Sequence, residues 1–319
     1  MSSNVNYPLL LVHCRRGLFQ MTICQSCNYK FQCENCDCNL TTYRSYETNM
    51  QLICNQCQSY YNYPKICPSC QSTKLDSVFG GIEDLVETVA KEYNEVVYRF
   101  DNLKVNTITL DQANIMATTR IFDPAIDYTI FQTIVFVQAD NLLSSADYLV
   151  SEDTHQALAN LLLSIESKTK VVFDTQDPES FFWRNLARLN SQHQEPISIL
   201  EWFSQFVQIE SNNRNKYDLP PFHNLILLTT QNKNKDKSLQ QIQATRQYLN
   251  MTIRDLGLQG VELGSIYQAR FFRRKGYFSH HLLVRYPKQY QSFFELSKIV
   301  KFIASTHNLQ VRLNPRHLF

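Results

Sequence analysis

Eight cysteines lie in four pairs within the first seventy residues, and two residues separate the members of each pair. This spacing lets a tight turn direct both sulfurs at one ion, and two such pairs complete a tetrahedral four-thiolate site. Eight ligands therefore predict two structural Zn²⁺ ions, with no open coordination position for catalysis. The pairs are Cys24 and Cys27, Cys33 and Cys36, Cys54 and Cys57, and Cys67 and Cys70.

Two other chemistries of paired cysteines remain open. A thioredoxin-like redox site needs one Cys-x-x-Cys pair at the start of a helix, which four closely spaced pairs do not favour. An iron–sulfur cluster also takes four thiolates. Because the block holds few apolar residues, we expect metal binding to supply much of its folding free energy, on the order of 10 kcal/mol per site.

Composition limits the partners and the compartment. The net charge of +2, from 31 basic and 29 acidic residues among 319, gives no global attraction to nucleic acid, so a polyanion site must be a local patch. No export signal and no apolar run of the ~18 to 20 residues that span a bilayer are visible. We therefore expect a cytoplasmic protein with no membrane partner, whose reducing surroundings suit metal-held thiolates better than disulfides.

The chain around and after the cysteine block predicts an α/β domain. Apolar strands alternate with helices, which implies a parallel sheet covered on both faces. The expected strands are 8–13, 95–100, 113–118, 133–137 and 170–173, and the expected helices are 82–93, 153–167 and 179–189. Because the first strand precedes the cysteines, residues 24–70 are interpreted as an insertion into a domain made of residues 1–23 and 71–208.

A polar, turn-rich stretch at 210–221 predicts a boundary, with a small α+β domain over residues 209–319. Its expected strands are 224–230, 261–270, 277–285 and 309–313, and its expected helices are 236–255 and 289–306.

This second domain carries the best candidate for nucleic-acid binding. No acidic residue occurs from Leu263 to Phe294, whereas basic and aromatic residues alternate there. Basic groups neutralise phosphates, and aromatic faces stack on unpaired bases. The candidate residues are Arg270, Arg273, Arg274, Lys275, Tyr277 and Arg285. If the hairpin were only a solvated one with core aromatics, strand alternation would bury at least half of its rings.

A weaker candidate surface lies in and around the cysteine block. Its scattered basic residues are equally well explained as a solvated face. They are Arg15, Arg16, Lys30 and Arg44.

Several of these motifs, taken together, resemble the family of PriA, the replication-restart helicase also called primosomal protein N′. They are Cys14-Arg15-Arg16-Gly17, the four cysteine pairs, Gly80-Gly81-Ile82-Glu83, Leu219-Pro220-Pro221-Phe222 and Arg273-Arg274-Lys275-Gly276-Tyr277, in the family's order. The resemblance covers nearly the whole chain and is most specific at the cysteines. It implies a RecA-like helicase lobe 2 interrupted by a double zinc-ribbon insertion, followed by the family's C-terminal domain.

The same resemblance implies how the cysteines are shared. The first and last pairs would hold one zinc and the two inner pairs the other. It also implies single-stranded or forked DNA as a partner, replication proteins such as single-strand-binding protein as further partners, and a role in primosome assembly and replication restart.

The helicase motor itself is not recognisable. A motor needs a glycine-rich loop that cradles phosphates, and no G-x-x-x-x-G-K-S/T occurs in the chain. The segment that corresponds to the family's arginine-finger motif, Gln156–Ile165, holds neither arginine nor glycine. We therefore expect a DNA-binding protein without ATPase or helicase activity. The alternatives are the C-terminal half of a split ATP-dependent 3′-5′ DNA helicase and a zinc-dependent protein-interaction scaffold.

Overall fold

The computed structural model describes residues 6–44, 49–100, 114–145, 147–190, 197–289 and 293–318. Ala113 and residues 290–292, which belong to two expected elements, lie outside this part of the chain. The chain forms two compact units, the first built mainly from residues up to 206 and the second mainly from 207–319. The second unit also takes in the short segments 32–38 and 146–149. None of the described helices has the length and apolar character needed to cross a membrane.

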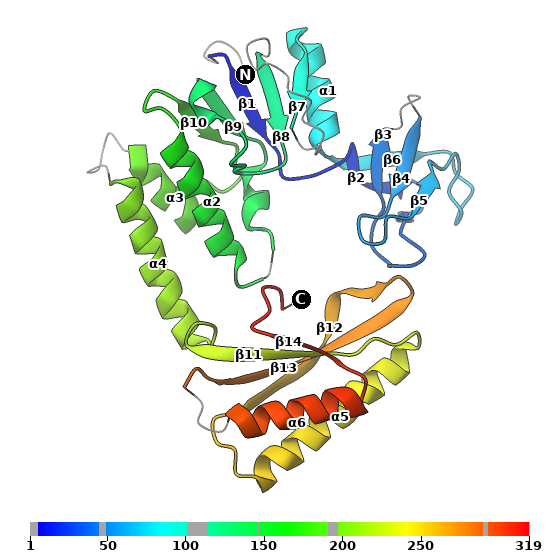
Figure 1. Ribbon diagram of the computed structural model, residues 1–319. Helices are drawn as coiled ribbons and strands as arrows, with labels where there is room; N and C mark the ends of the chain where they lie inside the picture. Colours follow the sequence, from blue (N-terminus) through cyan, green and yellow to red (C-terminus); the bar gives the residue numbers. More distant parts are fainter. Residues whose placement is uncertain are drawn as a thin grey trace. The chain divides into compact units, whose positions relative to one another are not determined.

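The first unit contains the expected parallel sheet, in the strand order β10-β9-β1-β8-β7 (Figure 1). Its strands are β1 (Leu9–Val12), β7 (Val97–Arg99), β8 (Ile115–Thr118), β9 (Thr133–Phe136) and β10 (Lys170–Phe173). Its helices are α1 (Ile82–Tyr93), α2 (Val150–Ser164), α3 (Phe181–Ala187) and the first part of α4 (Ile199–Lys216), which continues into the second unit. Leu10 and Val12 pack with α2, α3 and α4. Leu9 and Leu11 pack with α1. Every residue of β1 is therefore buried, as in strands covered on both faces.

A second, antiparallel sheet carries the cysteine turns, in the order β5-β4-β3-β2-β6. Its strands are β2 (Phe19–Cys24), β3 (Thr41–Arg44), β4 (Met50–Ile53), β5 (Tyr60–Asn62) and β6 (Leu75–Gly80). Gly81, directly after β6, lies so close to Gly17 that a Cβ there would overlap the Gly17 carbonyl oxygen. The backbone amide of Gly81 donates to Leu18 and that of Ile82 to Arg15, which joins this sheet to the start of α1.

The second unit is an α+β domain with the antiparallel order β12-β13-β11-β14 (Figure 1). Its elements are β11 (His223–Thr229), α5 (Lys235–Asp255), β12 (Glu262–Arg274), β13 (Tyr277–Pro287), α6 (Phe293–Thr306) and β14 (Gln310–Leu313). Residues from the sheet and from both helices form one core, including Ile226, Ile242, Leu282 and Val300.

The polar stretch after Glu210, expected to be turn-rich, is helical as far as Lys216, so this part of the prediction is wrong. The guanidinium of Arg214 pairs with Glu210 at 2.8 Å, one turn earlier, and lies over the ring of Tyr148. An ion pair at this spacing stabilises a helix that composition alone does not favour.

Candidate metal centre and nucleic-acid interface

The four cysteine pairs fold into four copies of one turn. In each copy, the residue after the second cysteine donates its backbone N–H to the carbonyl of the first cysteine at 2.8 to 2.9 Å. The first cysteine donates its own N–H to the carbonyl five residues later. The residue after the second cysteine always has a positive φ: Asn28 (59°), Asp37 (53°), Gln58 (64°) and Gln71 (59°). The turn is thus a local structure that each pair forms within six residues.

The eight sulfurs gather into two groups of four, the outer pairs in one and the inner pairs in the other. Within each group the ligand atoms all lie within 4.8 Å of one another. Cys24 and Cys70 approach to 3.6 Å between their sulfurs, as do Cys27 and Cys67. A disulfide would require about 2.05 Å, whereas four sulfurs around a tetrahedral zinc are about 3.8 Å apart. Each group can therefore hold one four-coordinate metal ion, in the grouping that the resemblance implies.

The outer group shows why a cation suits it. Burial raises the pKa of Cys24, but hydrogen bonds from the backbone amides of Cys27 and Ser26 and from the neighbouring thiols outweigh it and lower the pKa to about 6. The pKa of Cys70 is raised to about 12, because bonds with the other thiols and burial outweigh the hydrogen bond from the Ser72 amide. A divalent ion at this site would favour the ionised form of all four thiols.

The segment 32–38, which carries Cys33 and Cys36, contacts the tip of the β12–β13 hairpin inside the second unit. The backbone N–H of Lys275 points at the sulfur of Cys36 at 3.5 Å. Gly276 donates its N–H to the carbonyl of Asn35 at 2.9 Å. The guanidinium of Arg273 pairs with Asp37 at 3.1 Å. Three interactions therefore bind this loop to the hairpin.

Four of the six predicted DNA-binding residues lie at that hairpin tip: Arg273, Arg274, Lys275 and Tyr277. Lys275 and Gly276 form the turn with φ values of 51° and 81°. Arg270 lies nearby in a bulge, because six positions of β12, from Gln268 to Arg273, face only three of β13, from Phe278 to His280. Bulges reorient side chains and often occur beside functional sites. The bulge leaves Arg270 exposed.

The aromatic rings that alternate with the basic residues differ in exposure. Tyr277 is 40% exposed, whereas the other four are half-buried: Tyr267, Phe271, Phe272 and Phe278. Phe272 packs against Phe278 and His280, with ring centroids 5.3 and 5.0 Å away. Four rings are thus partly covered within the fold, and Tyr277 is accessible to a base.

Two predicted residues have other roles or places. Arg285 faces Leu225 and Glu262 in the sheet and lies eight residues along β13 from Tyr277, about 27 Å at the rise of a strand. The structure therefore does not bring it to the tip. Arg273 is half-buried, and its guanidinium lies over the ring of Phe278 as well as on Asp37.

Two basic residues at the tip were missed by sequence reasoning. Lys233 places its ammonium 5.7 Å from the ring centroid of Tyr277, and Lys235 places its own 5.7 Å from that of Phe272. Asn232 exchanges backbone hydrogen bonds with Phe278, which holds this segment beside β13. The lysines are visible in the sequence, but they precede the turn of the hairpin by about forty residues, and only the fold brings them to it.

The weaker surface around the cysteine block does not converge. Arg15 donates to the Asn141 side chain at 2.6 Å and lies over Phe79. Arg44 pairs with Glu87 at 2.6 Å. Two of its four basic groups thus make structural contacts.

Comparison with curated proteins finds replication restart protein PriA from several bacteria. The protein from Synechocystis sp. is 25% identical over 317 residues, which cover 94% of this chain and 36% of the relative. Those from Thermotoga maritima and Bacillus subtilis are each 22% identical, covering 85% and 70% of this chain and 35% and 28% of theirs. No protein-family model matches. This chain, which spans about a third of the length of these relatives, is thus related to the C-terminal region of replication restart protein PriA.

Proposed function

We propose that this chain is a zinc-containing, cytoplasmic DNA-binding protein that acts in replication restart on single-stranded or forked DNA, without ATPase or helicase activity of its own. The observation that carries the proposal is the surface at the hairpin tip, where cations and accessible rings from two distant segments lie together. We call this the hairpin surface. It comprises Lys233, Lys235, Arg270, Phe271, Arg274, Lys275 and Tyr277. Similarity to PriA over most of the chain supports the same role.

The chemistry of the hairpin surface suits unpaired strands. Its lysines and arginines neutralise phosphates without reading sequence, and this term falls steeply with salt. Tyr277 offers an exposed ring on which an unpaired base can stack. In a duplex the faces of the bases are covered by their neighbours, so this contact favours single strands. Replication proteins such as single-strand-binding protein are partners that this role would bring to the same DNA.

Zinc is the metal that the cysteine groups favour. Four thiolates in a closed tetrahedral arrangement are the usual ligand set of a structural Zn²⁺ ion. Its filled d shell imposes no other geometry. Bound there, the ions would hold the four turns, and the backbone N–H of Lys275 would donate an outer-shell hydrogen bond to the ligand Cys36. Metal analysis should find two zinc ions per chain. Absorption bands of iron–sulfur clusters in the visible range would contradict this assignment.

Two observations support binding without hydrolysis. Helix α2, which contains most of the segment matching the arginine-finger motif, carries no arginine. The carboxylate of Asp140 accepts hydrogen bonds from Thr175, Trp183 and the amide of Gln176, so its oxygens already have partners within the fold. Burial raises the pKa of Asp140, but these hydrogen bonds together outweigh burial and lower the pKa.

A salt series tests DNA binding. Fluorescence anisotropy with single-stranded and forked oligonucleotides would compare the wild-type chain with the triple variant Arg270→Ala, Arg274→Ala, Lys275→Ala. Each lost phosphate contact reduces the slope of log K against log salt by about 0.7 on single strands, so three contacts predict a decrease of about 2.

The matched control removes three exposed basic residues elsewhere, with Lys91→Ala, Arg254→Ala and Lys301→Ala. An equal slope for the hairpin variant and the wild type would reject the hairpin surface. Absence of DNA binding by the wild type would favour the scaffold alternative, and ATPase activity with a co-purified partner would favour the split helicase.

A further inference from the structure

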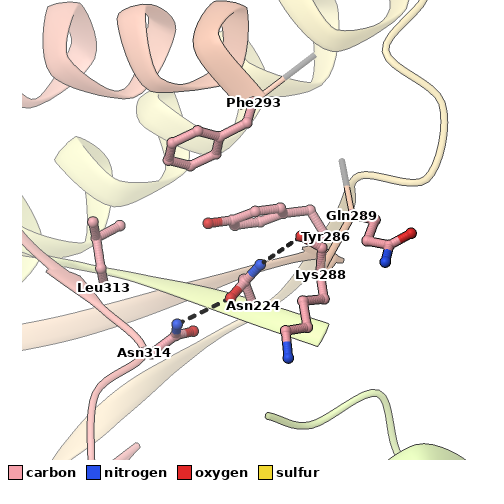
Figure 2. Close-up of a pocket in the computed structure, with 7 residues that line it drawn as sticks. All are labelled: Asn224, Tyr286, Lys288, Gln289, Phe293, Leu313 and Asn314. Carbon is pink, nitrogen blue, oxygen red and sulfur yellow. Dashed lines mark hydrogen bonds between the residues drawn. The ribbon is translucent and has the colours of Figure 1, made fainter. Parts of the chain in front are cut away.

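A polar and aromatic pocket of about 700 Å³ lies in the second unit at the end of β13 opposite the hairpin turn (Figure 2). The starts of β11 and α6 and the ends of β13 and β14 form it. The described residues that line it are Asn224, Tyr286, Lys288, Gln289, Phe293, Leu313 and Asn314. Its volume lies within the range of roughly 300 to 1,000 Å³ typical of small-ligand sites.

The pocket has an aromatic wall with accessible apolar surface. Tyr286 is only 5% exposed and forms the buried part of this wall. Phe293 stacks on Tyr286, with ring centroids 5.7 Å apart, and is 41% exposed. Leu313 is 60% exposed. Figure 2 shows these three side chains and the two asparagines around one open space. A flat ring that entered this space would cover apolar surface that now faces water.

The polar side of the pocket is held in one orientation. Asn314 accepts the backbone N–H of Leu225 at 2.7 Å and donates to the Asn224 side-chain oxygen at 3.0 Å. Asn224 donates in turn to the carbonyl of Lys288 at 3.5 Å. These bonds fix both amide planes and leave one N–H of each amide group for a ligand. The exposed Gln289 adds an amide that both donates and accepts.

The charge of the pocket favours an anion. Among the described lining residues Lys288 is the one charged group, and it is exposed. The positive end of the α6 dipole begins at Phe293, on the same side. The pocket therefore combines a stacking face, amides for the edge of a planar heterocycle, and a cation for an attached phosphate.

We infer that this pocket holds one unpaired nucleobase of a bound DNA strand, stacked on Phe293, with its edge at the amides and its phosphate at Lys288. The inference rests on the proposed DNA-binding function and assigns to it a second contact site. An acidic peptide would use Lys288 but would leave the amides and the stacking face without a matching planar partner. The hairpin surface and the pocket lie at opposite ends of β13, so an oligonucleotide has to be at least as long as this strand to reach both.

The test uses the full chain and a single-stranded oligonucleotide of about sixteen nucleotides. This length is the upper end of the range that one OB fold, a common single-strand-binding domain, covers. The oligonucleotide carries 2-aminopurine, whose fluorescence falls when the base stacks. Phe293→Ala should weaken binding about tenfold and abolish that quenching. The matched control is Phe294→Ala, because the neighbouring ring is 63% exposed and does not line the pocket.

Variants at Lys288 and Gln289 test the pocket without disturbing the fold, because both side chains are exposed. Lys288→Ala should reduce the salt slope by about 0.7, whereas Lys301→Ala on α6 should leave it unchanged. Gln289→Ala should weaken binding without changing the salt slope, since it removes no charge.

The outcomes separate this inference from the function on which it rests. If all three pocket variants bind within twofold of the wild type with unchanged quenching, while the hairpin variant loses affinity, the pocket inference is overturned and the proposed function stands. If the wild type binds no oligonucleotide, the proposed function itself fails. If dAMP or inorganic phosphate displaces the probe as effectively as unlabelled oligonucleotide, the pocket takes free nucleotides or phosphate, and the inference about a DNA strand is overturned.

Discussion

Acidification should destabilise the second unit through His281 on β13. Its ring is buried, shares a 2.8 Å hydrogen bond with Thr229 and packs edge-on against Tyr267. Burial, followed by the charges of Arg312 and His280, lowers the pKa of His281 from 6.5 to about 4. Between these two pKa values the His281 imidazole is therefore mostly neutral in the folded protein and mostly protonated in the unfolded chain.

The sign and size follow from proton linkage. Between pH 6.5 and 4 the unfolded chain binds a proton at His281 that the folded chain does not, so the free energy of unfolding falls as the pH falls. The loss is about 2 kcal/mol at pH 5 and reaches about 3 kcal/mol in full. Burial and Lys235 also lower the pKa of His280, which acts in the same direction.

Hydrogen exchange of the β11 and β13 amides at pH 7, 6 and 5 would measure this loss of stability. It reports on the second unit's sheet separately from any effect of pH on the four cysteine turns. The comparison is between the wild type and His281→Asn, with Lys301→Ala, an exposed residue on α6, as the control. We expect His281→Asn to remove about 2 kcal/mol of the difference between pH 7 and pH 5 and Lys301→Ala to keep it. Equal pH dependence in the wild type and His281→Asn would refute the reasoning.

Two further predictions concern the first unit and the metal turns. Removing the metal with a strong chelator should expose the amides of the four cysteine turns to hydrogen exchange, while the parallel sheet stays protected; continued protection of the turns in metal-free protein would contradict it. Gly81→Ala should lower the free energy of unfolding in urea by about 2 kcal/mol, because the new methyl group overlaps the Gly17 carbonyl oxygen. Gly257→Ala is the control, since no atom lies within 4 Å of a Cβ there and only the strain of its positive φ, about 1 kcal/mol, is expected.

Local patterns carried much of the prediction. Each Cys-x-x-Cys turn closes within six residues, so the spacing of the cysteines alone indicated four ligand pairs. Helix α1 begins and ends where its apolar periodicity begins and ends, at Ile82 and Tyr93. The continuous apolar run of β1 indicated a strand buried on both faces, and the parallel sheet confirms it.

Composition misled in the segment after Glu210. It has the composition of a turn, yet it continues α4, where Arg214 pairs with Glu210 and lies over the ring of Tyr148. The spacing of Glu210 and Arg214 is visible in the sequence, but such a pair contributes only about 0.3 kcal/mol, and the contact with Tyr148 depends on the fold.

What the sequence determined by itself was chemistry that nearby residues complete: the thiolate pairs, the helix and strand periods, and a basic, aromatic stretch without acids. Only the tertiary structure decided that Lys233 and Lys235 join the hairpin, that Arg285 stays apart from it, and that Asn224, Phe293 and Asn314 line one pocket. These positions depend on strand pairing between segments far apart in the chain, and no local spacing records which strands pair.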